Sequence, residues 1–290
     1  MRSILVLIAA PGSGAIDRDL VTRIGPETGA EPHWLAPREA VEFPLAGPVD
    51  EPELRARLGD RPVDLAVVDA KDRRKRLLLA DMDSTMIGQE CIDELGILAG
   101  VGDRISDITA RAMRGELDFE AALKERVGLM KGLPRAALAT VLSERITFTA
   151  GGRILIQTMR KHGAYTALVS GGFVEFTGFV TERLGFHEHR ANEFLWHGDV
   201  LSGEVREPIL GRDAKVYALR ELGNRLGLTP AEAIAVGDGA NDIPMLAAAG
   251  MGVALHAKPK VREAAPIRID HGDLTALLYL QGYTREEFVY

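Results

Sequence analysis

Leu77-Leu78-Leu79-Ala80-Asp81-Met82-Asp83-Ser84-Thr85 is the stretch that decides the fold of this 290-residue chain. Its apolar start predicts a short buried strand. Two aspartates end that strand, and two hydroxyl side chains follow them. Open α/β sheets keep their ligand sites at the carboxyl ends of their strands. Polar turn residues alone would explain an isolated Asp-x-Asp, so the interpretation as a site depends on partners elsewhere in the chain.

The chain from residue 76 to residue 290 alternates apolar runs with helical spacing, which predicts an α/β fold with a mainly parallel sheet. Further strands are expected at 164–169, 233–236 and 252–255. Residues from about 88 to 148 show helical spacing without a clear strand, so we expect a helical cap standing over the end of the first strand. Residues from about 192 to 210 alternate and contain turn residues, which predicts a β-hairpin.

Residues 1–75 are expected to form a separate small α+β domain. Its predicted order of elements is typical of a ferredoxin-like sandwich and resembles a degenerate ACT domain. Dimerisation or scaffolding is its expected role, which leaves a homodimer open, and amino-acid sensing is the alternative. The run Lys71 to Arg76 is interpreted as a solvated linker, with contact to nucleic acid as the weaker alternative at a net charge of −7.

Composition places the chain among folded soluble proteins, with 46% hydrophobic and 27% charged residues. The single Cys91 excludes an intrachain disulfide and a metal site built from several cysteines. No apolar run reaches the ~20 residues that span a bilayer, so no membrane segment is expected. The apolar N-terminus is short for a signal peptide and fits a strand better. We therefore expect a cytoplasmic protein.

Several strand ends and one helix start offer polar groups to the same crevice. Besides the aspartates of the opening stretch, these are Ser170-Gly171-Gly172, Lys215 and Gly237-Asp238-Gly239-Ala240-Asn241-Asp242. Carboxylates from two strands suit a hard cation such as Mg²⁺. A hydroxyl followed by two glycines lets backbone N–H groups approach an anion. With a lysine opposite the acids, the pattern predicts transfer of a phosphoryl group.

These four segments, in this order over residues 77 to about 255, resemble the motifs of the haloacid dehalogenase superfamily of phosphatases. The resemblance implies a Rossmann-like core with a helical cap. Within that superfamily the chain resembles the phosphoserine phosphatases. This closer resemblance rests on Asp81 to Ile87 followed by Glu90, on Asp118-Phe119-Glu120 with Arg126-Val127, and on Ser170 to Phe173.

The resemblance implies that Asp81 is the nucleophile and that Asp83 is the general acid and base. Lys215 would screen charge and hold the phosphate. The Mg²⁺ ligands implied are Asp81, the backbone carbonyl of Asp83, and Asp238. Asp242 would act through a metal-bound water.

The substrate implied by the resemblance is O-phospho-L-serine, a small molecule with an ammonium and a carboxylate beside its phosphate. Glu90 would pair with the ammonium and Arg126 with the carboxylate. Ser170 and the Gly171 amide would hold phosphate oxygens, and Asn241 would orient Lys215 or touch the substrate. Hydrolysis to L-serine and phosphate would be the last step of serine biosynthesis.

Three alternatives stay open at this point. The enzyme could pass the phosphoryl group to another alcohol such as homoserine. It could act on a different small phosphomonoester, because caps set specificity. It could also be an amino-acid-sensing binding protein with an idle phosphatase core, although every motif position holds a competent residue.

Overall fold

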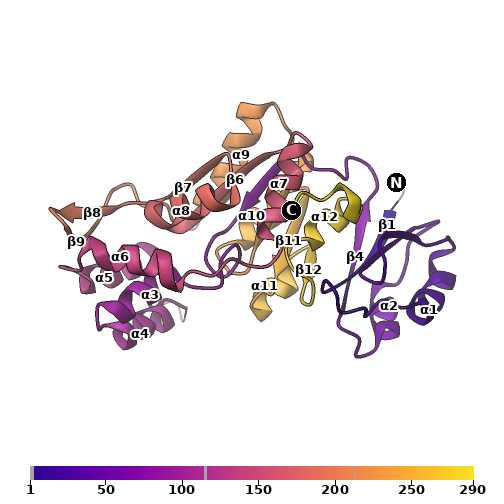
Figure 1. The fold of residues 1–290 in the computed structure, drawn as a ribbon, viewed down its shortest axis with the longest axis horizontal. Coiled ribbons are helices and arrows are strands. Elements are labelled where there is room, and N and C mark those ends of the chain that lie inside the picture. Colours follow the sequence, from indigo (N-terminus) through magenta and orange to yellow (C-terminus); the bar gives the residue numbers. More distant parts are fainter. Residues whose placement is uncertain (1–2, 114–115, 212) are drawn as a thin grey trace.

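The computed structural model describes residues 3–113, 116–211 and 213–290. A central sheet with helices lies between two smaller parts, the N-terminal elements at one end and the inserted helices with a short ribbon at the other (Figure 1). The predicted α/β class is confirmed.

Six parallel strands form the central sheet, in the order β12-β11-β10-β5-β6-β7. They are β5 (Leu77–Ala80), β6 (Tyr165–Phe173), β7 (Glu188–Asn192), β10 (Ala233–Gly237), β11 (Met251–Leu255) and β12 (Ile267–Ile269). Strand β5 is central, and its last residue Ala80 pairs with Val236 of β10 and Leu168 of β6. The residues that follow these three paired positions therefore meet at one edge.

Alternate residues of the sheet enter two different apolar clusters, as the period of a strand requires. Leu78 and Ala80 pack with helices α7 (Gly152–Lys161), α8 (Val174–Leu184) and α12 (Ala276–Leu280). Leu77 and Leu79 pack with helices α9 (Ala214–Leu226), α10 (Ile243–Ala248) and α11 (Pro259–Ala264). The sheet is thus covered on both faces, which explains why β5 is apolar throughout.

The segment after β5 forms the predicted run of helices. It contains α3 (Cys91–Leu98), α4 (Gly102–Met113), α5 (Phe119–Leu129), α6 (Arg135–Thr140) and a π-helical turn η1 (Val141–Arg145). A two-stranded ribbon, β8 (Phe194–His197) and β9 (Val200–Val205), packs on α5. Backbone hydrogen bonds from Gly132 and Arg135 to the ribbon join the two pieces, so the ribbon and the helices together form the cap.

The N-terminal residues form β1 (Ser3–Ala9), α1 (Arg18–Thr28), β2 (His33–Ala36), β3 (Ala40–Pro44), α2 (Glu51–Leu58) and β4 (Val63–Asp69). Their antiparallel sheet has the order β2-β3-β1-β4. One face, with Leu5 and Leu7, packs on its own two helices. The other face, with Val6 and Ile8, joins the large apolar cluster of the central part. The sheet therefore lies between its own helices and the core.

The interpretation of residues 71–76 as a solvated linker holds for four exposed residues of the run and is wrong for Arg73 and Lys75. The side chains of Arg73 and Lys75 are buried. Arg73 donates to the backbone carbonyls of Tyr279 and Leu280 and to the carboxylate of Glu42. These bonds neutralise the charge of Arg73 and give its N–H groups acceptors. In the sequence alone, the same charged run indicates a segment exposed to solvent.

Other elements were not predicted. Strand β7 carries charged residues. The short 3₁₀ turn η2 (Pro230–Glu232) precedes β10, and β12, α12 and the 3₁₀ turn η3 (Arg285–Glu287) lie near the end of the chain. The ribbon is shorter than the predicted hairpin. Among the described residues, no helix is both long and apolar enough to cross a bilayer.

Candidate active site

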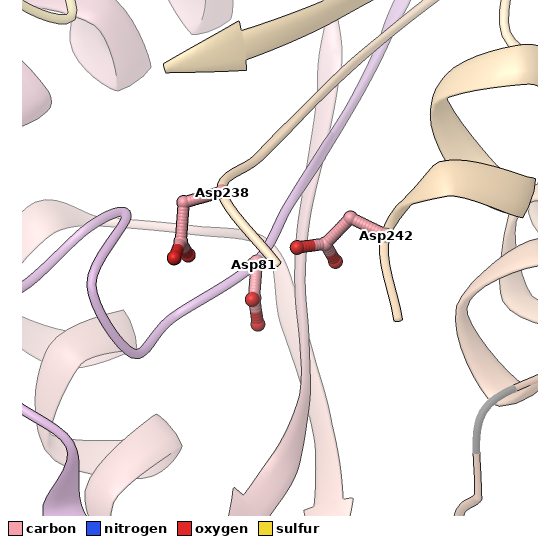
Figure 2. Close-up of side chains that lie close together, drawn as sticks. All are labelled: Asp81, Asp238 and Asp242. Atoms are coloured by element: carbon pink, nitrogen blue, oxygen red, sulfur yellow. The ribbon is translucent and has the colours of Figure 1, made fainter. Parts of the chain in front are cut away.

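Three buried aspartates come together at the carboxyl edge of the sheet (Figure 2). Asp81 follows β5, Asp238 follows β10, and Asp242 precedes α10. One carboxylate oxygen from each lies within 4.8 Å of the others. The close approach of Asp242 needs Gly237, because a Cβ built there would lie 2.3 Å from the Asp242 carboxyl carbon.

Lys215, near the start of α9, is the cation that faces this cluster. Its buried ammonium lies 2.6 Å from Asp81 Oδ1 and 2.5 Å from Asp242 Oδ1. Burial lowers the pKa of Lys215, but the carboxylates of Asp242 and Asp81 outweigh burial and hold it above its usual value. The lysine is therefore charged at any working pH.

One ammonium does not balance three carboxylates. Burial, followed by the charge of Asp242, raises the pKa of Asp81 well above its usual value. The same two causes raise the pKa of Asp238 to about 6. A bound divalent cation would reverse both shifts, and its preferred ligands are carboxylate oxygens. The donor set therefore fits a divalent metal, with Asp81, Asp238 and Asp242 as the side chains able to hold it.

Asp83 lies two residues from Asp81 but in different surroundings. One carboxylate oxygen accepts a hydrogen bond of 3.1 Å from the Cys91 amide at the start of α3. Burial, followed by the charge of Glu90, raises the pKa of Asp83 to about 7. This carboxyl group can hold a proton near neutral pH. Asp83 is not one of the three residues whose carboxylate oxygens gather in the cluster of Asp81, Asp238 and Asp242.

The residues from Ser170 to Gly172 lie where the pairing of β6 with β7 becomes irregular. The Ser170 hydroxyl accepts a hydrogen bond from the Gly172 amide at 2.9 Å. Phe119 of the cap lies over Gly171, since a Cβ built there would be 3.0 Å from its ring. One cavity is lined by Phe119, Ser170, Gly171, Gly211, Ala214, Lys215 and Asn241. Its polar groups are those that an anion would require.

Arg126 lies on α5 of the cap. Its guanidinium donates to the Ala122 carbonyl at 3.2 Å and to Thr109 Oγ1 at 3.5 Å. Burial lowers its pKa, and the carboxylates of Asp93, Glu90 and Asp83 oppose that shift. Glu90 is exposed and accepts a hydrogen bond from Ser84, whose φ of +55° is left-handed. A cation on the cap thus faces acids on the loop after β5.

All the residues predicted from the sequence lie in or beside this region, in three groups. Asp81, Asp238, Asp242 and Lys215 form the charged centre, Ser170, Gly171 and Asn241 line the cavity with Lys215, and Asp83, Glu90 and Arg126 lie toward the cap. Their individual roles stay predictions.

Three further residues of the site were not found from the sequence. Thr85 donates to Asp238 Oδ1 at 3.1 Å. Asn192 at the end of β7 donates to the Gly171 carbonyl at 2.9 Å and accepts from the Leu210 amide at 2.7 Å. Lys258 places its ammonium 3.9 Å from Asp238 Oδ2. The position of Lys258 shortly after the strand 252–255 was the available signal.

Comparisons with known proteins agree with this geometry. A family model described as haloacid dehalogenase-like hydrolase matches residues 78–247. The chain is 42% identical to a phosphoserine phosphatase of Streptomyces coelicolor, over 87% of this chain and 62% of that protein. It is 44% identical to a phosphoserine phosphatase of Haemophilus influenzae, over 76% of this chain and 71% of that protein.

Among solved structures, a haloacid dehalogenase family hydrolase from Salmonella enterica serovar Typhi is similar along nearly the whole chain. The TM-score is 0.83 at 30% identity, and the match covers 96% of this chain and 98% of that chain. The similarity therefore includes the parts that flank the central sheet.

Proposed function

This chain belongs to the phosphoserine phosphatases of the haloacid dehalogenase-like hydrolase family, and on that premise we propose that it hydrolyses O-phospho-L-serine to L-serine and phosphate. The observation that carries the proposal is the buried cluster of Asp81, Asp238 and Asp242 around Lys215, beside the cavity with Ser170. It is an arrangement suited to a phosphoryl group and to a carboxylate that attacks it.

Asp81 is the nucleophile in this proposal. Its carboxylate attacks the phosphorus, the bond to the serine oxygen breaks, and an aspartyl-phosphate forms. Asp83 gives its proton to the departing serine oxygen and then takes one from the water that hydrolyses the intermediate. The raised pKa of Asp83, about 7, supports this role, because the group can both donate and accept near neutral pH.

Ser170, the Gly171 amide and Lys215 would hold the phosphate oxygens in the cavity that they line. Asn192 fixes the Gly171 carbonyl and so orients this backbone. Asn241 would orient Lys215 or touch the substrate.

We propose Mg²⁺ as the divalent cation. Asp81, Asp238 and the Asp83 carbonyl would hold it, with Asp242 acting through a water molecule. When bound, it supplies positive charge that offsets the repulsion between a carboxylate and a phosphate dianion. Lys215 adds to that charge at 2.6 Å from the nucleophile.

The amino-acid part of the substrate would lie between the core and the cap. Arg126 would take its carboxylate and Glu90 its ammonium. The charge of Glu90 already acts on Arg126, and both lie near Asp83. A zwitterion fits between two such groups because each of its charges finds an opposite one.

The test is release of phosphate from a panel of phosphomonoesters in the presence of Mg²⁺. We expect strong preference for L-phosphoserine and loss of activity when EDTA removes the metal. Release from other esters, with phosphoserine ignored, would refute the proposed roles of Glu90 and Arg126. No release from any ester would favour a binding protein.

An added acceptor separates hydrolysis from phosphotransfer. With homoserine present, we expect phosphate release to stay equal to serine formation. Serine formed in excess of phosphate would show that the phosphoryl group passes to the acceptor.

We also propose that residues 1–75 form a separate domain with a scaffolding role, followed by the phosphatase part at 76–290 with its cap at about 88–148. A homodimer and a cytoplasmic location stay predictions from the sequence.

A further inference from the structure

We propose that Asp64, which lies in the N-terminal sheet, is a positioning residue for the active site. It acts through the loop of residues 270–275. This loop contacts residues 256–258, which we call the Lys258 segment, and residues 149–152, which we call the returning segment because they lead from the cap back to the core. This inference rests on the proposed function only for its kinetic consequence; its structural consequence can be measured without a substrate.

In the first step, Asp64 is joined to the loop of residues 270–275 by hydrogen bonds. Asp64 lies on β4 and is 4% exposed. Its Oδ1 accepts from the Asp270 amide at 2.7 Å, and its Oδ2 accepts from the Gly272 amide at 2.7 Å. The His271 amide lies 3.1 and 3.2 Å from the two oxygens. A buried carboxylate with three N–H donors fixes a backbone firmly, because charge-assisted hydrogen bonds are strong.

The second step runs from Gly272 to the metal site. His256 Nε2 lies 2.8 Å from the Gly272 carbonyl and so donates to it. The φ of His256 is +44°, a left-handed conformation that tertiary contacts must hold in place. Two residues later, the Lys258 amide donates to the Asp238 carbonyl at 3.3 Å. The conformation at His256 therefore sets where Lys258 lies beside Asp238.

The third step runs from the same loop to the cap. Leu274 donates its amide to the Ala150 carbonyl at 3.1 Å. Gly151 has a φ of +77°, and a Cβ built there would lie 2.7 Å from the Thr275 nitrogen. The backbone of the returning segment, which joins the cap to α7, is thus pressed against the loop. Movement of the loop has to move this segment as well.

One loop therefore links the N-terminal sheet to both sides of the active site. An undisturbed Asp64 would keep the Lys258 segment and the returning segment in the positions that catalysis needs. Loss of its acceptors should loosen both segments while leaving Asp81, Lys215 and Asp242 unaltered.

The experiment compares Asp64→Asn with Glu39→Gln. Glu39 is also 4% exposed and also joins the N-terminal part to the core, but its carboxylate accepts from Tyr279 and Arg285. Asn keeps the size of Asp64 but turns one acceptor into a donor that faces an N–H group. For each variant we would measure amide hydrogen exchange, kcat and KM for L-phosphoserine, and thermal stability.

We expect Asp64→Asn to speed exchange at 149–152 and 256–258 and to lower kcat about tenfold, a coupling of ordinary size. Glu39→Gln should lower thermal stability comparably but leave exchange at these residues and kcat unchanged. A further variant, His256→Asn, tolerates a left-handed φ but loses the bond to Gly272. It should speed exchange at 256–258 and leave 149–152 unchanged.

Faster exchange confined to 270–272 in Asp64→Asn, or equal effects of Asp64→Asn and Glu39→Gln, would overturn the inference. If phosphoserine is not a substrate, kcat cannot be measured, but the exchange pattern still decides. Failure of the proposed function and failure of this inference are therefore distinguishable.

Discussion

Asp81 and Asp83 show how two aspartates in one short motif acquire different properties from their surroundings. Asp81 lies against Lys215, whereas Asp83 accepts from the Cys91 amide and lies near Glu90. Burial raises the pKa of both carboxyl groups, but the ion pair with Lys215 favours the charged form of Asp81, whereas the nearby Glu90 favours the protonated form of Asp83. The difference supports a nucleophile at one position and a proton donor at the other.

Replacement of Asp83 by Asn should lower kcat for phosphoserine by roughly 10²–10⁴-fold, because an amide cannot supply the proton to the leaving oxygen. The Asn oxygen can still accept from the Cys91 amide, so the local fold should persist. Steady-state kinetics with phosphoserine and with p-nitrophenyl phosphate measure the effect. The loss in kcat/KM, which reports formation of the aspartyl-phosphate and not its hydrolysis, should be much smaller with the second ester, whose leaving group needs no proton. Equal losses with both would contradict this role.

Arg126→Met should lower kcat/KM for phosphoserine by about 10–100-fold, as expected for a lost charge-assisted pair. Activity on O-phosphoethanolamine, which lacks the carboxylate, should change little. The matched control is Arg104→Met on α4, an exposed arginine of the same cap. Equal losses of kcat/KM on both esters would show that Arg126 supports the cap and does not bind the carboxylate of the substrate.

At the residue scale, the sequence was informative where a motif has fixed spacing and uninformative where partners are far apart. Asp81, Ser170, Lys215 and Asp238 follow from strand ends and helix starts. Asn192 could not be found, because its partner Gly171 lies 21 positions away and its strand, β7, is charged. Thr85 lies inside the motif, but nothing local indicates that it bonds to Asp238, 153 positions away.

At the scale of the elements, the backbone conformation of the segment that returns from the cap (residues 149–152) depends on Gly151. Gly151→Ala should destabilise the protein by more than Gly163→Ala. Both glycines have a positive φ, but a Cβ at Gly163 meets nothing within 4 Å. The conformational cost of Ala is about 1–2 kcal/mol at either position, and the clash at Gly151 should add about 1–3 kcal/mol.

Urea unfolding of the two alanine variants measures this difference. Equal losses of unfolding free energy would show that the contact between Gly151 and Thr275 does not constrain the returning segment. A kcat that falls only in Gly151→Ala would further link this segment to catalysis.

Most helices and strands of the central part could be predicted from apolar spacing, and the strands expected at 164–169, 233–236 and 252–255 overlap β6, β10 and β11. The misassigned elements are those in which charge is satisfied by distant partners. Strand β7 holds Glu188 in ion pairs with Arg190 and Arg225. Within the run 71–76, Arg73 is buried because it donates to the Glu42 carboxylate and to the backbone carbonyls of Tyr279 and Leu280. In both cases the polarity of the local sequence indicates exposure to solvent. The distant partners that satisfy these charges become visible only in the tertiary structure.

For the whole molecule, Arg73 ties the N-terminal sheet to the core. Arg73→Met should destabilise the protein by about 3–5 kcal/mol, because it leaves the half-buried Glu42 without the Arg73 guanidinium and two carbonyls without a donor. The control is Arg74→Met, which removes a partly exposed pair with Glu287 and should cost about 0–1 kcal/mol. Urea unfolding measures both, and similar losses would contradict a structural role for the buried residue.

In the mechanism that we propose, Asp81 accepts the phosphoryl group of phosphoserine. The most direct test of this step is phosphate release from L-phosphoserine with Mg²⁺, measured for the wild-type protein and for Asp81→Asn. An Asn side chain fills the same space but has no carboxylate to attack the phosphorus. We predict rapid release by the wild type and none above background by the variant. Release by the variant at a rate near that of the wild type would show that Asp81 is not the nucleophile.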